Sequence, residues 1–158
     1  MIVLYISLGC ITSCLAGMLE PEADMSFDVF LTFNGDCRKA LEFYARVFVQ
    51  EMPKQIMTYG QNPEGTSEAD KDRVLYASMP LFGINMMFCD CPTGSRHVKG
   101  NNISLTVGLN DETEIRRIFQ ALGEGGEVYM PLEKTFFSEL FGMVCDPFGI
   151  IWQFSKTA

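Results

Sequence analysis

The chain has 158 residues, of which 47% are hydrophobic, enough for one domain with a substantial core. Its 12 basic and 20 acidic residues give a formal net charge of −8. This charge argues against a nucleic-acid partner, because binding to the phosphate backbone needs an excess of clustered Lys and Arg. Acidic membranes are disfavoured for the same reason. This composition favours a cytoplasmic domain that handles small molecules or protein partners.

The first 24 residues differ from the rest of the chain. No charged residue occurs over positions 2–19. A secretory signal has such an apolar middle but should begin with Lys or Arg, and positions 11–14 loosely resemble a lipoprotein cleavage box. The segment is also compatible with a structural helix, or with upstream sequence before a natural start at Met25. We therefore expect an apolar N-terminal extension or upstream sequence over 1–24 and a single domain over 25–158.

The first half of the domain is predicted to be one β-α-β-β-β unit, over about residues 26–91. A β-branched and aromatic run at 29–33 is followed by Asn-Gly, by Asp36 as an N-cap, and by an amphipathic helical stripe over 40–48. Further strands are predicted at 55–59, 74–79 and 85–89. The loop at 60–73 is long and polar, which is typical of a disordered segment or a cleft lid.

The second half repeats this pattern over about residues 101–157. A strand is predicted at 103–107, followed by Asp111 as the cap, with Glu114 completing a capping box, and a helical stripe over 115–122. Further strands are predicted at 127–130, 141–145 and 151–155. A four-stranded unit with one helix buries only one face of its sheet, so two units must pair in an α+β fold.

Several segments resemble the PhnB-like branch of the glyoxalase/bleomycin-resistance/dioxygenase (vicinal-oxygen-chelate, VOC) superfamily. They lie at 31–36, 40–44, 125–128, 130–132 and 146–153, and the resemblance covers nearly the whole chain from Met25. It implies two βαβββ modules that form a U-shaped mixed β-sheet around a cleft, and a homodimer. In metal-dependent members, His, Glu or Gln side chains from the first and last strand of each module hold a divalent metal.

The resemblance places those four ligand positions on Val29, Met87, Asn102 and Gln153. Valine and methionine are not ligands for a hard or borderline cation, and neutral amides bind such ions weakly on their own. We therefore expect no metal at the usual place and no other cofactor. Many PhnB-like relatives carry a histidine where this chain has Tyr76, so the obvious imidazole base is also replaced.

Alternation along the strands extends the predicted cleft. Side chains predicted to face it alongside the four positions are Leu31, Phe33, Asn85, Cys89, Ser104, Thr106 and Ile151. Side chains predicted to face the helices are Ile103, Leu105, Val107, Trp152 and Phe154. The predicted ligand-binding residues are Val29, Leu31, Phe33, Tyr76, Met87, Asn102, Ser104, Thr106 and Gln153. Such a half-apolar, half-amide and hydroxyl surface is typical of a small-molecule pocket.

No residue is assigned a catalytic role. Tyr76 could donate a proton, although strand tyrosines are more often structural, and Glu139 could reach the cleft mouth as a general base, although nothing pairs with it. Cys37, one residue past Asp36, is better explained as a structural thiol than as a nucleophile. His97, near Arg96 and Lys99, could bind an anion, but a lone loop histidine is usually solvated.

Three functions are compatible with these residues. The first is a binding protein of the antibiotic-sequestering kind that encloses a small organic ligand without a metal. The second is a lyase, isomerase or dioxygenase-type enzyme, with or without a metal, acting on a small oxygenated metabolite. The third is an interaction module without a ligand. The replaced metal ligands favour the first over the second, and the polar cleft face disfavours the third.

Overall fold

The computed structural model describes residues 28–157, so the predictions for residues 1–24 lie outside the described part of the chain. The first module contains β1 (Val29–Phe33), α1 (Cys37–Val47), β2 (Ile56–Thr58), β3 (Val74–Leu81) and β4 (Ile84–Asp90), with the short 3-10 helix η1 (Tyr59–Gln61) after β2. The second module contains β5 (Leu105–Leu109), α2 (Glu112–Gly123), β6 (Glu127–Glu133), β7 (Phe141–Cys145) and β8 (Ile151–Lys156). Both modules have the predicted βαβββ order.

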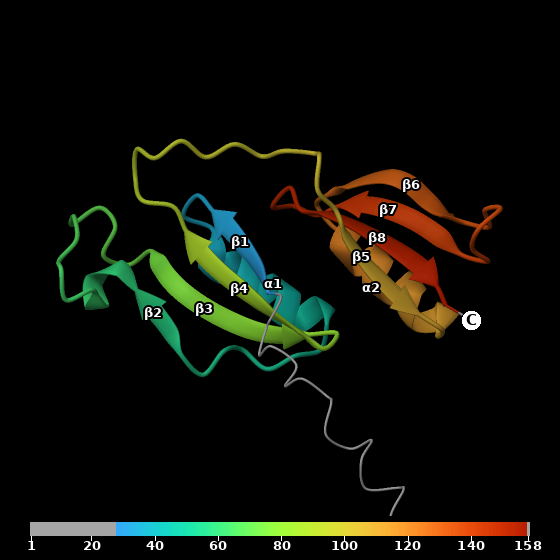
Figure 1. Ribbon diagram of the computed structural model, residues 1–158, viewed down its shortest axis with the longest axis horizontal. Coiled ribbons are helices and arrows are strands. Elements are labelled where there is room, and N and C mark those ends of the chain that lie inside the picture. The colour runs from blue at the N-terminus through green and yellow to red at the C-terminus, as the bar shows by residue number, and fades with distance from the viewer. Residues whose placement is uncertain (1–27, 158) are drawn as a thin grey trace, which may run out of the picture.

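Each module forms its own four-stranded sheet. The strand orders are β1-β4-β3-β2 and β5-β8-β7-β6, and in each sheet the first and last strands of the module pair in parallel. The predicted α+β class with two mixed-sheet modules is confirmed. Among the described strands no ladder joins β1 to β5, so the strands are divided between two sheets. Figure 1 shows the modules side by side, each with its helix behind its sheet.

The helices form because their apolar side chains recur at helical spacing and cover the sheets. In α1, the buried stripe includes Leu41, Tyr44 and Val47, and in α2 it includes Ile115 and Leu122. Val107, Trp152 and Phe154 are buried in the same core, as predicted for the helix side of the second sheet. No helix within residues 28–157 combines the length and apolar character needed to cross a membrane.

The N-terminus of α1 is capped by a residue distant in sequence. The predicted cap, Asp36, makes no side-chain capping bond. The buried carboxylate of Asp90, at the end of β4, instead accepts hydrogen bonds from the backbone N–H groups of Gly35 (2.7 Å), Cys37 (3.0 Å) and Val74 (3.0 Å). The prediction for Asp36 was therefore wrong, because the parallel pairing of β1 with β4 brings a better-placed carboxylate to the same helix end.

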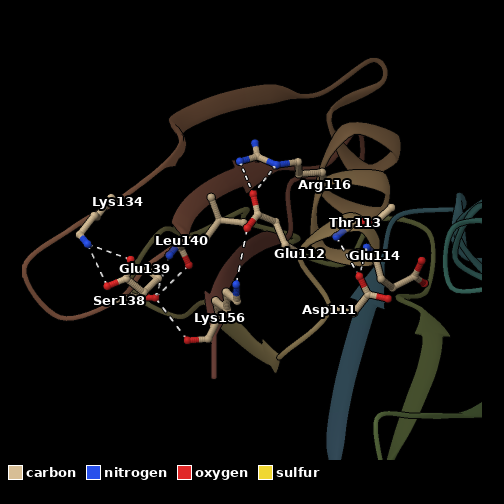
Figure 2. Close-up of polar contacts among 10 residues, drawn as sticks. All are labelled: Asp111, Glu112, Thr113, Glu114, Arg116, Lys134, Ser138, Glu139, Leu140 and Lys156. Carbon is tan, nitrogen blue, oxygen red and sulfur yellow. Dashed lines mark hydrogen bonds and ion pairs between the residues drawn. The ribbon is translucent and has the colours of Figure 1, made fainter. Parts of the chain in front are cut away.

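The cap of α2 is local and was predicted correctly. Asp111 accepts hydrogen bonds from the N–H groups of Thr113 and Glu114 (Figure 2). The Glu114 carboxylate pairs with Arg117 at 2.6 Å. Only the Asp111 half of the predicted capping box is therefore present.

A buried carboxylate in the turn between β7 and β8 joins the two modules. Asp146 accepts hydrogen bonds from the Tyr44 hydroxyl on α1 (2.6 Å) and from Trp152 Nε1 on β8 (2.9 Å). It also accepts hydrogen bonds from the backbone N–H groups of Phe148 (2.9 Å) and Ile150 (3.0 Å). Burial, and then the negative charge of Asp146, raise the pKa of Tyr44 well above its ordinary value, so its hydroxyl remains a donor.

Aromatic rings surround this junction. The Tyr44 ring centroid lies 5.8 Å from that of Trp152 and 6.0 Å from that of Phe148. Phe148 also packs edge-on against Phe33 of the first module, at 5.9 Å. The modules are therefore held together through α1 and the β7–β8 turn, and we use the name junction for this set of contacts around Asp146.

The long loop at 60–73 is tied to the next long loop. Asp70 accepts hydrogen bonds from the Ser67 hydroxyl (2.7 Å) and from the Thr93 N–H (2.8 Å), and it contacts Arg73 Nε at 3.3 Å. The bonds from Thr93 and then Ser67 lower the pKa of Asp70. The loop is therefore an ordered segment rather than the disordered one that its polar sequence also allowed.

Candidate functional site

The face of the first sheet that its helix does not cover, here called the open face, differs from the prediction along β1. In the ladder, Phe30 pairs with Met87 and Thr32 with Cys89. Leu31 and Phe33 are only 8% and 3% exposed and belong to the core. The prediction that Leu31 and Phe33 face the open side was wrong, because counting back from the helix missed the register by one residue, and such a slip reverses every side chain of a strand.

Strand β4 follows the predicted alternation. Asn85, Met87 and Cys89 of β4 are partly exposed, and they alternate with buried core residues. Tyr76 on β3 is 38% exposed. The Cys89 thiol lies 3.6 Å from the Thr32 hydroxyl. The open face of the first sheet is thus mainly apolar, with a thiol and hydroxyls interspersed.

The second sheet brings the predicted polar side chains together. Thr106 pairs with Gln153 in the β5–β8 ladder, and Gln153 Nε2 donates a hydrogen bond to Ser104 Oγ at 2.7 Å. Ile103 is 75% exposed and does not face the helices. The prediction for Ile103 was wrong because β5 begins only at Leu105, so the alternation does not extend to it.

A groove of about 700 Å³ lies between the edge of β1 and the segment that leads into β5. The β7–β8 turn contributes its remaining wall. The lining segments are 28–32, 97–100, 102–105 and 148–151. Three large apolar side chains in these segments are strongly exposed: Phe30 (51%), Val98 (66%) and Ile103 (75%). Solvent-exposed apolar residues gathered around one hollow are typical of a binding surface.

The structure divides the predicted ligand-binding residues into three groups. Four line the groove, namely Val29, Leu31, Asn102 and Ser104. Four others, Tyr76, Met87, Thr106 and Gln153, lie on strands outside its lining. Phe33 is buried in the core. The groove is therefore centred on the strand edges rather than on the middle of the sheet faces.

Two basic residues of the loop before β5 line the groove and were not among the predicted ligand-binding residues. His97 Nε2 lies 3.1 Å from the Thr32 carbonyl oxygen, to which the ring N–H can donate. Lys99 lies over Gly149, whose φ of +91° suits glycine, and its Cδ lies 2.7 Å from the point that a Cβ there would occupy. The sequence indicated these residues only as a group of basic side chains in a long loop. Their position beside the groove depends on tertiary contacts.

Glu139 lies on the β6–β7 connection, outside the groove lining. It is ion-paired with Lys134 at 2.8 Å (Figure 2). The hydrogen bond from Lys134 lowers the pKa of Glu139. A general base that acts near neutral pH requires a raised carboxyl pKa, so this environment favours a structural ion pair.

The thiol of Cys37 is an equally poor nucleophile. Its side chain is fully buried at the start of α1. Burial, followed by the negative charge of Asp90, raises the pKa of Cys37. The thiol therefore remains protonated, as expected for a structural residue.

These features can be compared with known proteins. A family model described as 3-demethylubiquinone-9 3-methyltransferase matches residues 25–155. The chain belongs to this family. YjdN of Escherichia coli (strain K12) is 26% identical to it over 139 residues, covering 82% of this chain and 93% of YjdN. The predicted resemblance to the PhnB-like branch of the VOC superfamily is therefore confirmed.

Solved structures with the same fold support this assignment. PA1353 from Pseudomonas aeruginosa has a TM-score of 0.75 at 29% identity, over 84% of this chain and 97% of that chain. A PhnB protein from Bacillus cereus has a TM-score of 0.71 at 29% identity, over 84% and 100%. A glyoxalase-related enzyme from Fulvimarina pelagi, at 18% identity and a TM-score of 0.50 over 84% and 89% of the chains, shares the fold alone.

The four positions that the resemblance assigns to metal ligands do not form a donor set suited to a divalent metal. Val29 packs against the core, and its neighbour on the exposed face of β1, Phe30, is no metal ligand either. The Gln153 amide is engaged with Ser104. Within residues 28–157, no three His, Cys, Asp or Glu side chains gather closely enough to hold an ion. The other two positions hold Met87 and Asn102, which are not ionisable. The four positions therefore do not fit a divalent metal ion.

Proposed function

We propose that this PhnB-like protein binds a small, largely apolar organic molecule in the groove between β1 and β5. The observation that carries the proposal is the exposure of Phe30, Val98 and Ile103 around one groove of about 700 Å³. That volume lies within the range of small-molecule sites. Large apolar side chains gain free energy when a ligand covers them, at about 25 cal/mol per Å² of apolar surface.

Neutral polar groups beside the apolar rim would orient the ligand. Asn102 and Ser104 line the groove, and Gln153 supports Ser104 by a hydrogen bond of 2.7 Å. Amides and hydroxyls both donate and accept. They can therefore satisfy a ligand carbonyl or hydroxyl without a metal, and we propose that binding requires no divalent cation.

Replacing Phe30 with alanine is expected to weaken binding of the neutral fluorescent dye phenylnaphthylamine about tenfold, because one apolar wall of the groove is lost. Fluorescence titration of the full chain measures the dissociation constant. Addition of EDTA is expected to leave this constant unchanged.

The matched control is Phe136→Ala, which removes a fully exposed phenylalanine on the β6–β7 connection, outside the groove. This variant should bind the dye as the unaltered chain does. Equal binding by the Phe30 and Phe136 variants, or loss of binding in EDTA, would contradict the proposal. A panel of dicarbonyls, organic acids and glycopeptide antibiotics can then be screened by thermal shift, where a ligand at 100 times its dissociation constant stabilises by about 2.7 kcal/mol.

Enzymatic action on a small oxygenated metabolite is the second candidate function. It rests on the family: the family description names a methyltransferase, and the Fulvimarina pelagi neighbour is described as glyoxalase-related. The groove offers His97 as its one imidazole, and that ring already contacts the Thr32 carbonyl. We therefore favour binding over catalysis.

We also propose that the protein is a cytoplasmic homodimer. Met57 and Tyr76 of the first sheet are 48% and 38% exposed, and a second copy could cover them. Sedimentation equilibrium is expected to give about twice the chain mass of 17.7 kDa. A mass of one chain at micromolar concentration would argue against the dimer without affecting the groove.

A further inference from the structure

We infer that the groove selects ligands that carry an anionic group beside an apolar body, and that Lys99 receives the anion. This inference rests on the proposed function and specifies the chemical class of the ligand. It depends on where the Lys99 side chain lies, on the ion pairs of the other lysines, and on the groups that surround it.

The Lys99 side chain is positioned by packing. Gly149 leaves the space that a Cβ would fill, and Lys99 Cδ and Nζ lie 2.7 Å and 3.3 Å from that point. The aliphatic stem therefore lies on the β7–β8 turn, which is itself held by the junction at Asp146. A lysine whose stem is packed loses less conformational entropy on binding than a freely extended one.

The Lys99 ammonium also differs from most lysines of the chain in its partners. Lys39, Lys71, Lys134 and Lys156 each lie within 4.0 Å of a carboxylate oxygen. Within residues 28–157, no such ion pair includes Lys99. In a protein with a net charge of −8, a lysine that lines an apolar groove without a carboxylate partner is a specific point of attraction for an anion.

The other groups of the groove define what Lys99 can bind. His97 keeps a second ring nitrogen besides the one near Thr32, and Asn102 contributes an amide. Asp28 is the acidic residue of the lining, and it already takes part in another interaction. The apolar rim of Phe30, Val98 and Ile103 then takes the remainder of the ligand. A carboxylate or sulfonate attached to an aromatic or aliphatic body matches this arrangement.

Two related dyes test this inference in the full chain. Anilinonaphthalene sulfonate carries an anion, and phenylnaphthylamine has the same aromatic body without one. We expect the sulfonate to bind about fivefold more tightly at low salt, and the difference to shrink as salt screens the ammonium. In Lys99→Gln, the preference for the sulfonate should be lost, so that the two dyes bind alike.

Lys54→Gln is the matched control, because Lys54 is an exposed lysine outside both the groove and the ion pairs. It should keep the preference for the sulfonate. Equal binding of both dyes to the unaltered chain, or an equal loss of both in Lys99→Gln, would overturn the ligand class while leaving the groove as a binding site. Absence of binding by either dye would instead overturn the proposed function, and with it this inference.

Discussion

Replacing Asp146 with alanine is expected to lower the free energy of unfolding by about 4 kcal/mol. The carboxylate is 3% exposed and accepts four hydrogen bonds. Its loss leaves the Tyr44 hydroxyl and the Trp152 indole N–H buried without an acceptor, and each such group costs about 1–3 kcal/mol. Urea unfolding followed by far-UV circular dichroism measures the change.

Asp111→Ala is the control for the Asp146 variant. It removes a carboxylate that accepts two hydrogen bonds at the exposed end of α2, and a cap of this kind contributes about 1 kcal/mol. If both variants cost the same, the junction does not contribute as described. A second unfolding transition in the Asp146 variant would show that the modules had become uncoupled.

Replacing Asp90 with alanine is expected to cost about 3 kcal/mol, whereas Asp36→Ala should cost less than about 0.5 kcal/mol. Asp90 is 2% exposed and accepts hydrogen bonds from three backbone N–H groups. Asp36 precedes α1 directly but makes no capping bond, and its contact with Lys39 at 3.7 Å is exposed. The same urea measurement compares the two variants.

The comparison between Asp36 and Asp90 isolates the distant cap, because both residues are aspartates near one helix end. A larger loss in the Asp36 variant would show that the local residue caps the helix in solution. A negligible loss in the Asp90 variant would show that the three N–H groups find other acceptors. In either case, the assignment of the cap to Asp90 would be wrong.

The repeated architecture could be predicted because it is encoded locally. The stripes of α1 and α2 follow helical spacing, and the run at Val29–Phe33 is a strand in both the prediction and the structure. The need to cover the second face of each sheet then predicted the pairing of the modules. A helix with strong apolar periodicity can be recognised from sequence, because its buried side chains recur every three or four residues.

What could not be predicted depends on contacts between distant segments. The acceptor for the α1 N-terminus lies 53 residues beyond Cys37, and no local pattern distinguishes Asp90 from other acidic residues. Which face of the sheet each β1 side chain occupies became clear only from the pairing of β1 with β4. The predicted position along β1 was wrong by one residue, which placed Leu31 and Phe33 on the wrong face. The contribution of Lys99 to the groove required Gly149 to lie beneath it.

The junction and the groove share the β7–β8 turn, but the loop between the modules is part of the groove and not of the junction, which affects how such proteins can diverge. Tyr44, Asp146 and Trp152 connect the modules through buried contacts. Val98, Ile103 and Asn102 are exposed residues of the loop between the modules. Substitutions in that loop leave the buried contacts intact, so descendants of one ancestral gene can acquire different chemical preferences while inheriting the same folding stability.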